Sequence, residues 1–259
     1  MLTKLTKYEF TTAAKTYLPF YGIILLFALL NRFSVRLNYE SFYLPQGLVM
    51  TAYIMLLTGL AVVTFLMGIL RFKKNLLGDE GYLMFTLPAQ RWQLVMAKVI
   101  SSVVWSVAGV FVGVLSIFII AVDKTFITEF FKMIGNADFG AIVVGPLALV
   151  LYILGFIIIA LLGVSSTYIM IYLSMSLGHM SNKNKLVMSF VWYFVVSFVW
   201  QTLTTVVGAV CANIGVFDSI FETQSLGVAL MMGIGYMLLV NGLSFFGTTF
   251  VLQHKLNLE

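Results

Sequence analysis

The chain has 259 residues, of which 61% are hydrophobic and 10% are charged, and its formal net charge is +5 at pH 7. Soluble domains hold roughly 25% charged and about 45–50% apolar residues, and a domain of this length has too little interior to bury so much apolar surface. The composition therefore excludes a soluble globular domain and predicts that most side chains face lipid or other membrane-spanning helices.

Residues 1–16 are expected to form an amphipathic helix at the membrane surface. Its apolar face consists of Leu2, Leu5, Tyr8, Phe10, Ala13 and Tyr17. The opposite face carries Lys4, Lys7 and Lys15, which suit anionic lipid headgroups. Glu9 falls inside the apolar arc, and two interpretations stay open: its side chain extends to water, or it pairs with a basic residue of segment 71–92 or of a partner chain.

Six stretches are apolar enough to form spanning helices, which need about 20 mostly apolar residues. They cover residues 17–30, 48–70, 94–122, 142–177, 186–212 and 226–252, which predicts an all-α membrane protein. The first stretch is short and is expected to continue to about Leu37. The fourth is long, so we expect it to be tilted, to extend beyond the membrane or to break near Gly163, with Gly145-Pro146 at its start.

The basic residues predict the orientation of these spans. Eleven of the 15 lysines and arginines lie in the termini, connections and span ends that six spans would place on the side of the N-terminus. Positive residues favour cytoplasmic segments, so the sequence predicts a multi-pass protein of the cell membrane with both termini in the cytoplasm. No repeat or hydrophilic domain interrupts the pattern, and residues 1–259 are expected to form one transmembrane domain.

The connection between the second and third spans, residues 71–92, carries the most specific pattern. It begins with a basic run at residues 71–74. Gly78 is expected to end the preceding helix in a left-handed conformation. Asp79 and Glu80 suit the start of a short helix, and Pro88 suits the first turn of the third span.

Between these signals lies an apolar knob, which consists of Tyr82, Leu83, Met84 and Phe85. An exposed apolar group of this size commonly fills a binding surface. A turn that enters the lipid boundary would have the same composition, and the properties of the connection leave both interpretations open.

No pattern in the sequence predicts catalysis or cofactor binding, so the chain is not expected to be an enzyme. No Gly-Lys dipeptide occurs, which argues against the phosphate-binding loop of ATPases. His179 and His254 are too few for a zinc site, and both are expected to be solvated loop residues. The span cores lack a convincing ionisable residue, which argues against ion-coupled carriers and membrane hydrolases. A scaffold, a receptor-like protein and a permease driven by another chain remain.

Uncharged polar residues in the spans are candidates for a translocation path. They are Thr58 in the second span and Ser197, Gln201 and Thr205 in the fifth. Hydroxyl groups in membrane helices also bond their own backbone or a neighbouring helix, and this interpretation stays open. Gln201 is the most informative of the four, because an amide that faces lipid is costly.

Two pairs of small residues four positions apart allow another helix to approach closely. Gly109 and Gly113 form one pair in the third span, where packing within the chain is the expected use. Gly208 and Ala212 form the other pair in the fifth span.

The connection also carries a resemblance to a known family. The run Gly78-Asp79-Glu80-Gly81-Tyr82-Leu83, continued by Phe85-Thr86-Leu87-Pro88, Arg91-Trp92 and Lys98, resembles permease subunits of type-2 ATP-binding-cassette (ABC) exporters from Gram-positive bacteria. Within that family the chain is most similar to permeases that export amphipathic peptides such as phenol-soluble modulins. The resemblance implies a short cytoplasmic coupling helix that docks on a separate ATPase. Its coupling residues would be Asp79, Glu80, Tyr82, Leu83, Met84, Phe85 and Arg91.

The resemblance further implies partners and a function. Two permease copies, identical or different, would pair around the first and fifth spans, which makes Gly208 and Ala212 candidate contacts. ATP and Mg²⁺ would bind to the partner ATPase, and no nucleic-acid partner is expected. The expected function is the export of a hydrophobic or amphipathic substrate, foremost a peptide. The alternative is a membrane protein that senses or sequesters a ligand without transporting it.

Overall fold

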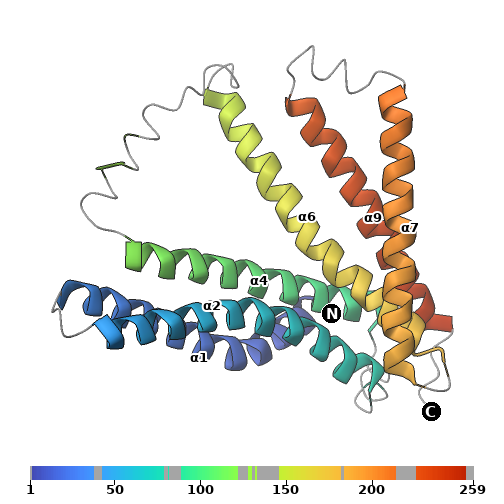
Figure 1. Cartoon of the computed structure of the whole chain (residues 1–259). Coiled ribbons are helices and arrows are strands. Elements are labelled where there is room, and N and C mark those ends of the chain that lie inside the picture. The colour runs from blue at the N-terminus through green and yellow to red at the C-terminus, as the bar shows by residue number, and fades with distance from the viewer. Residues whose placement is uncertain are drawn as a thin grey trace. The chain divides into compact units, whose positions relative to one another are not determined.

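The computed structural model describes residues 2–37, 43–78, 81, 89–121, 128–129, 132, 146–181, 184–213 and 226–254. Its elements are α1 (Leu2–Leu37), α2 (Tyr43–Phe72), the π-helix η2 (Lys73–Leu77), α4 (Arg91–Ala121), α6 (Pro146–Gly178), α7 (Lys185–Asn213) and α9 (Leu226–His254) (Figure 1). The six α-helices are long and apolar enough to cross a membrane, and the part of the chain described here contains no strand. The chain is an all-α, multi-pass membrane protein.

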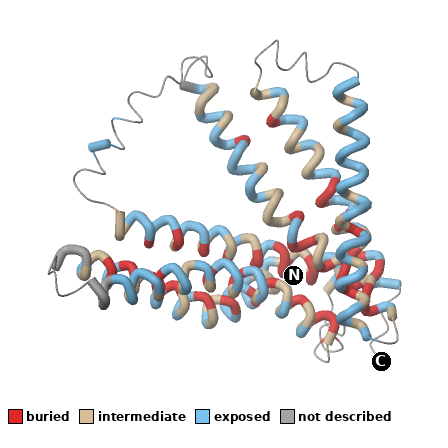
Figure 2. The backbone as a smooth tube through the Cα atoms, in the orientation of Figure 1, coloured by how far each residue is buried: buried red, intermediate tan, exposed pale blue. Residues whose placement is uncertain are grey.

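Helix α1 joins two elements that the sequence predicts separately. It continues from Leu2 through Pro19 to Leu37, so residues 2–16 are the first turns of one long helix, and their place at the membrane surface stays a prediction. Its buried residues recur every three or four positions, which puts them on one face (Figure 2); they are Glu9, Ala13, Tyr17, Tyr21, Ile24, Ala28 and Asn31. Glu9 is therefore buried and interacts within the chain, which excludes its extension to water.

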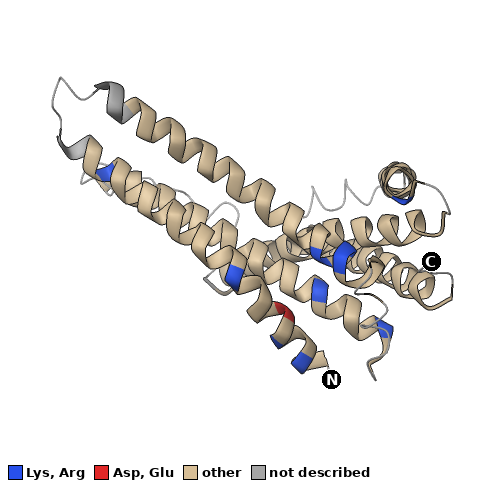
Figure 3. Ribbon diagram, turned by 90° about the horizontal axis from the view of Figure 1, so that it is seen from below, with Lys and Arg blue, Asp and Glu red and all other residues tan. Residues whose placement is uncertain are grey.

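The start of α1 exposes its lysines and also two residues of the predicted apolar face, Tyr8 and Phe10. Lys4, Lys7 and Lys15 are all exposed, away from the buried face of the helix. Charged residues are sparse along the described helices (Figure 3), which agrees with spans that cross lipid.

The helices group into two compact units. Unit 2 contains Leu2–Gly68 and Ile100–Ala137, so it holds α1, most of α2 and most of α4. Unit 1 contains Ile69–Val99 and Asp138–Glu259, so it holds the end of α2, η2, the start of α4, and α6, α7 and α9. That residues 1–259 act as one transmembrane domain stays a prediction.

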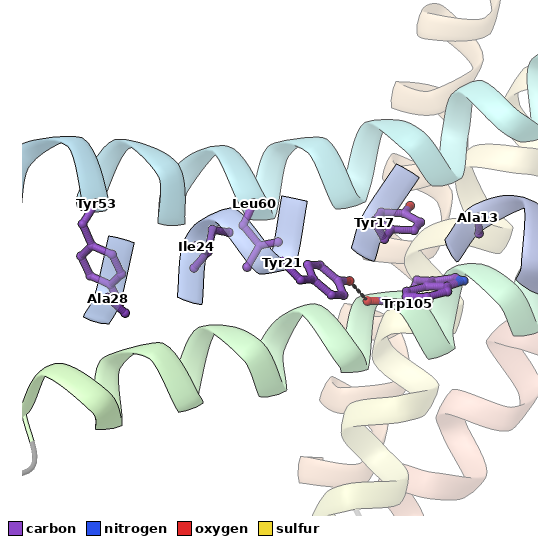
Figure 4. Close-up of a cluster of buried hydrophobic side chains, with 8 residues drawn as sticks. All are labelled: Ala13, Tyr17, Tyr21, Ile24, Ala28, Tyr53, Leu60 and Trp105. Carbon is purple, nitrogen blue, oxygen red and sulfur yellow. Dashed lines mark hydrogen bonds between the residues drawn. The ribbon is translucent and has the colours of Figure 1, made fainter. Parts of the chain in front are cut away.

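The core of unit 2 is rich in aromatic rings (Figure 4). The indole of Trp105 stacks on Phe10 and Tyr17, with ring centroids 4.8 Å and 5.1 Å away. The hydroxyl of Tyr21 donates to the Trp105 carbonyl oxygen at 2.8 Å. A Cβ atom at Gly109 would lie 3.3 Å from that hydroxyl, so this glycine serves packing within the chain, as predicted.

Helix α6 is the common packing partner in unit 1, where it contacts both α7 and α9. It begins at Pro146 and passes through Gly163 without a break, so the expected start is confirmed and the break near Gly163 is not found. The Ser165 hydroxyl donates to the amide oxygen of Asn241 on α9 at 3.2 Å. The amide nitrogen of Asn241 donates to the Leu162 carbonyl at 3.2 Å, which joins the two helices within their apolar stretches.

Candidate functional site

The connection after α2 begins on a firmly packed base. Phe72, the last residue of α2, is fully buried, and its ring stacks on that of Tyr172 in α6 with centroids 4.0 Å apart and planes 5° from parallel. Leu76 and Leu77 of η2 are also buried, whereas Lys74 is exposed. Residues 72–77 therefore have an apolar side, which is buried within unit 1, and a cationic side, which is exposed.

The turn that follows η2 depends on two glycines, though not for the predicted reason. Gly78 ends the helix, but its φ of −100° and ψ of −169° are extended, so the predicted left-handed conformation is wrong. The reason for glycine is space. A Cβ atom added at Gly78 would lie only 2.9 Å from the Lys74 carbonyl oxygen. A Cβ atom added at Gly81 would lie only 2.7 Å from the Leu76 carbonyl oxygen. The Gly81 N–H donates to the Gly78 carbonyl at 2.8 Å, so the chain folds back against the last turn of η2.

Six of the seven predicted coupling residues lie outside the described residues. They are Asp79, Glu80, Tyr82, Leu83, Met84 and Phe85, together with Pro88. The coupling helix therefore stays a prediction, while both ends of its connection are described.

The connection ends at Arg91, the first residue of α4. The Arg91 guanidinium donates to the carbonyl oxygen of Leu252 in the last turn of α9. Carbonyls in the last turn of a helix lack donors within the helix, and a cation there also interacts favourably with the helix dipole. Arg91 thus ties the start of α4 to the end of α9. The connection is anchored on α6 at one end and on α9 at the other.

His179 is a buried residue that the sequence did not mark. The prediction that it is solvated is wrong, because only 6% of its surface is exposed, whereas His254 is exposed. Its Nδ1 lies 2.9 Å from the Met175 carbonyl oxygen, which also accepts the His179 backbone N–H at 3.0 Å.

The charges around His179 oppose its protonation. Burial lowers the pKa of His179, and the positive charges of Lys185 and Lys73 lower it further, while the hydrogen bond to Met175 acts in the opposite direction. The imidazole is therefore neutral at pH 7, and Nδ1 carries the proton that the Met175 carbonyl accepts.

The candidate path residues do not form one described cluster. Ser197, Gln201 and Thr205 lie along one face of α7 at four-residue spacing, whereas Thr58 belongs to unit 2. The hydroxyls of Thr58 and Thr205 donate to their own helix, to the carbonyls of Ile54 and Gln201, at 2.9 Å each. Gln201 is exposed on α7.

The second small-residue pair lies on an open surface of α7. Among the described residues outside its own helix turn, no atom lies within 4 Å of a Cβ atom built at Gly208, and Ala212 is exposed. This face is available to lipid or to another helix, and its use as a contact between permeases stays a prediction.

Among the residues that the structure describes, no cluster of three or more His, Cys, Asp or Glu side chains could hold a metal ion. Comparison with protein-family models, curated proteins and solved structures finds no match. The site is therefore defined by its own geometry: a connection between two membrane helices that is anchored at both ends in unit 1.

Proposed function

We propose that this chain is the membrane-spanning permease subunit of an ATP-driven exporter and that the connection after α2 couples it to a separate ATPase. The observation that supports this proposal is the attachment of the connection to other helices at both of its ends. A segment that transmits force from a soluble partner must be attached firmly to the helices it moves. The Phe72–Tyr172 stack and the hydrogen bond from Arg91 to Leu252 supply those attachments on α6 and α9.

The apolar knob at residues 82–85 would be the part that docks on the ATPase. It lies between Gly81, which folds back on η2, and Arg91, which is tied to α9. Burial of one large apolar side chain in a groove is worth about 1.5–3 kcal/mol, so a few such residues could hold a weak partner. The two glycines would fix where the knob begins.

The substrate would be hydrophobic or amphipathic, with an amphipathic peptide as the first candidate. The exposed large side chains of α6, α7 and α9 are predominantly apolar, and the hydroxyls of Thr58 on α2 and Thr205 on α7 are bonded to their own backbone. Such surfaces offer a moving substrate few fixed polar partners. Two permease copies would enclose the path, and ATP and Mg²⁺ would bind to the ATPase.

The decisive experiment measures docking and coupling together. The chain is expressed with a candidate ABC ATPase from the same genome, and co-purification and peptide-stimulated ATP hydrolysis are measured. Leu83→Asp should abolish both, because a charge would be desolvated without a partner, while the volume-conserving Leu83→Met should retain them. A thermal melt of each permease variant alone checks its folding.

Each result has a definite meaning. Docking and stimulation that survive Leu83→Asp would show that the knob is not the coupling element. A permease that unfolds with Leu83→Asp would make the knob a packing turn. If the unaltered chain binds no ATPase, the exporter proposal fails, and the ligand-sensing alternative takes its place.

A further inference from the structure

Helices α6 and α9 interlock along most of the length that they share. Side chains of one helix fill the space beside glycines of the other. A Cβ atom at Gly155 would lie 3.1 Å from the side chain of Leu230, and one at Gly247 would lie 3.2 Å from that of Leu173. The hydrogen bonds from Asn241 to α6 lie between these two points. These contacts cover about 27 Å of α6 at 1.5 Å per residue, and a rotation of one helix against the other would break them, so the pair is rigid.

Helix α7 is held to α6 near its start. A Cβ atom at Gly178 would collide with the backbone of Ser189, and the Ser189 hydroxyl lies 3.5 Å from the Met175 carbonyl oxygen. Val196 is the last buried residue along α7, all of which is described. Residues 201–207 are exposed on every side of the helix. The ribbons of α6 and α7 separate toward their far ends (Figure 1).

The backbone directly before α7 suits a pivot. Asn184 has a φ of 52°, a left-handed conformation that asparagine adopts more readily than most residues. Its carbonyl oxygen accepts the N–H of Met188 at 3.0 Å, so the first turn of α7 starts from this residue. Residues at the ends of helices commonly absorb the dihedral changes of a hinge.

A hydrogen bond joins the far half of α7 to α9. It forms between the hydroxyls of Thr204 on α7 and Tyr236 on α9. The Thr204 hydroxyl donates its proton to the Trp200 carbonyl at 2.7 Å, so Tyr236 is the donor to the Thr204 oxygen. Bonds of this kind between membrane helices shift an equilibrium only about threefold on average, so this one can open readily.

We propose that α7 is a hinged helix that swings about the contact of Gly178 with Ser189, and that the bond from Tyr236 to Thr204 is the latch that holds its far half against α9. The interlocked α6–α9 pair resists such a motion, whereas the buried side chains of α7 lie only in its first half. The hinge does not depend on the exporter proposal. If that proposal holds, the connection after α2, which is anchored on α6 and α9, would move this pair against α7.

Distances between spin labels measure the swing. In a Cys211→Ser background, Val207→Cys with Met231→Cys reports on α7 and α9, and Leu154→Cys with Met231→Cys reports on α6 and α9. All three labelled positions are exposed. The full chain, at one copy per phosphatidylcholine nanodisc, is measured by double electron–electron resonance. The α7–α9 labels should show a short and a long distance, and the α6–α9 labels should show one narrow distance.

Removal of one hydroxyl tests the latch. Tyr236→Phe should raise the ratio of the long to the short α7–α9 distance about threefold and leave the α6–α9 distance unchanged. Tyr193→Phe removes the same atom from an exposed tyrosine in the first half of α7 and should change neither distribution. Both variants keep the aromatic ring, and a thermal melt of each checks its folding.

Four outcomes would overturn the hinge. They are a single narrow α7–α9 distance in both the parent and the Tyr236→Phe chains, equal broadening for both label pairs, an equal effect of Tyr193→Phe, and a long distance that vanishes when an unlabelled second copy shares the nanodisc. The last outcome would make the far half of α7 a contact between copies. The parent chain alone decides whether α7 moves, so the question is settled even if a tyrosine variant misfolds.

Discussion

Replacement of Phe72 by alanine tests whether the base of the connection is held by its ring. Phe72 is fully buried and stacks on Tyr172 at 4.0 Å. Deletion of a buried phenylalanine side chain costs about 3–5 kcal/mol, of which the ring pair contributes about 0.5–1.5 kcal/mol. The contact lies at the end of a spanning helix, where lipid tails can partly fill the space, so we expect a cost of about 3 kcal/mol. Local opening of η2 should then become at least about a hundredfold more frequent.

Hydrogen exchange with mass spectrometry measures that opening. Peptides that cover residues 73–78 should lose protection in Phe72→Ala, while peptides from α9 should keep it. Tyr172→Phe retains the stacked ring and should retain protection, and Phe198→Ala removes the same atoms from an exposed site on α7. Unchanged exchange at residues 73–78 would refute the anchor. Equal loss of protection in α9 would mean that the ring supports the whole unit.

Three further predictions concern neighbouring contacts. The pKa of His179 is lower in the folded chain than in the unfolded chain. The thermal stability of the protein should therefore fall as the pH drops below about 6.5 and should level off below the folded pKa. His179→Gln should remove this pH dependence, and His254→Gln should not. Arg91→Met should speed amide exchange in the last turn of α9 about tenfold, since one capping bond to Leu252 is lost, and unchanged exchange would show that the cap is dispensable. Asn241→Leu should lower the stability of unit 1 to detergent unfolding by about 1 kcal/mol or less, because bonds between membrane helices average about 0.6 kcal/mol, and a gain in stability would contradict a stabilising role.

The spans could be predicted from the sequence because lipid leaves the backbone no other partners. A backbone group without a hydrogen bond costs several kcal/mol in the membrane, so an apolar stretch must be helical throughout. The same physics explains why Gly163 does not break α6. Glycine weakens a helix in water by about 1 kcal/mol relative to alanine, but within lipid the broken helix is far worse. At this position the Gly163 carbonyl even accepts a second donor, the Thr167 hydroxyl, at 3.0 Å.

The join between residues 1–16 and the first span was not predictable from hydropathy. The polar start and the apolar stretch differ in composition, and Pro19 lies near the predicted boundary, inside the first turns of the predicted span. The helix continues because its buried face continues: Ala13 and Tyr17 belong to the same core as Tyr21 and Ile24. Tertiary packing therefore overrides the local helix-breaking tendency of proline.

The burial of His179 could not be predicted from local sequence patterns, because it depends on a contact with α7. A Cβ atom at Gly178 would collide with the backbone of Ser189, so this glycine lets the end of α6 and the start of α7 approach closely. The sequence shows Gly178 and His179 beside a short connection, which resembles an ordinary solvated turn. The contact becomes visible only once the Ser189 hydroxyl is placed near the Met175 carbonyl.

Two arginines donate hydrogen bonds to carbonyls in the last turns of neighbouring helices, and this role affects how the coupling residues are assigned. Arg32 donates to the Ile119 carbonyl in the last turn of α4 at 2.5 Å, and Arg91 donates to that of Leu252 in α9. Carbonyls at these ends have no donors within their helices, and few waters reach them near lipid. A basic residue beside a membrane helix is therefore not evidence of a partner by itself. Arg91 ties the start of α4 to the end of α9, so within the proposed coupling set the contact with an ATPase would fall to the apolar knob between the two anchors.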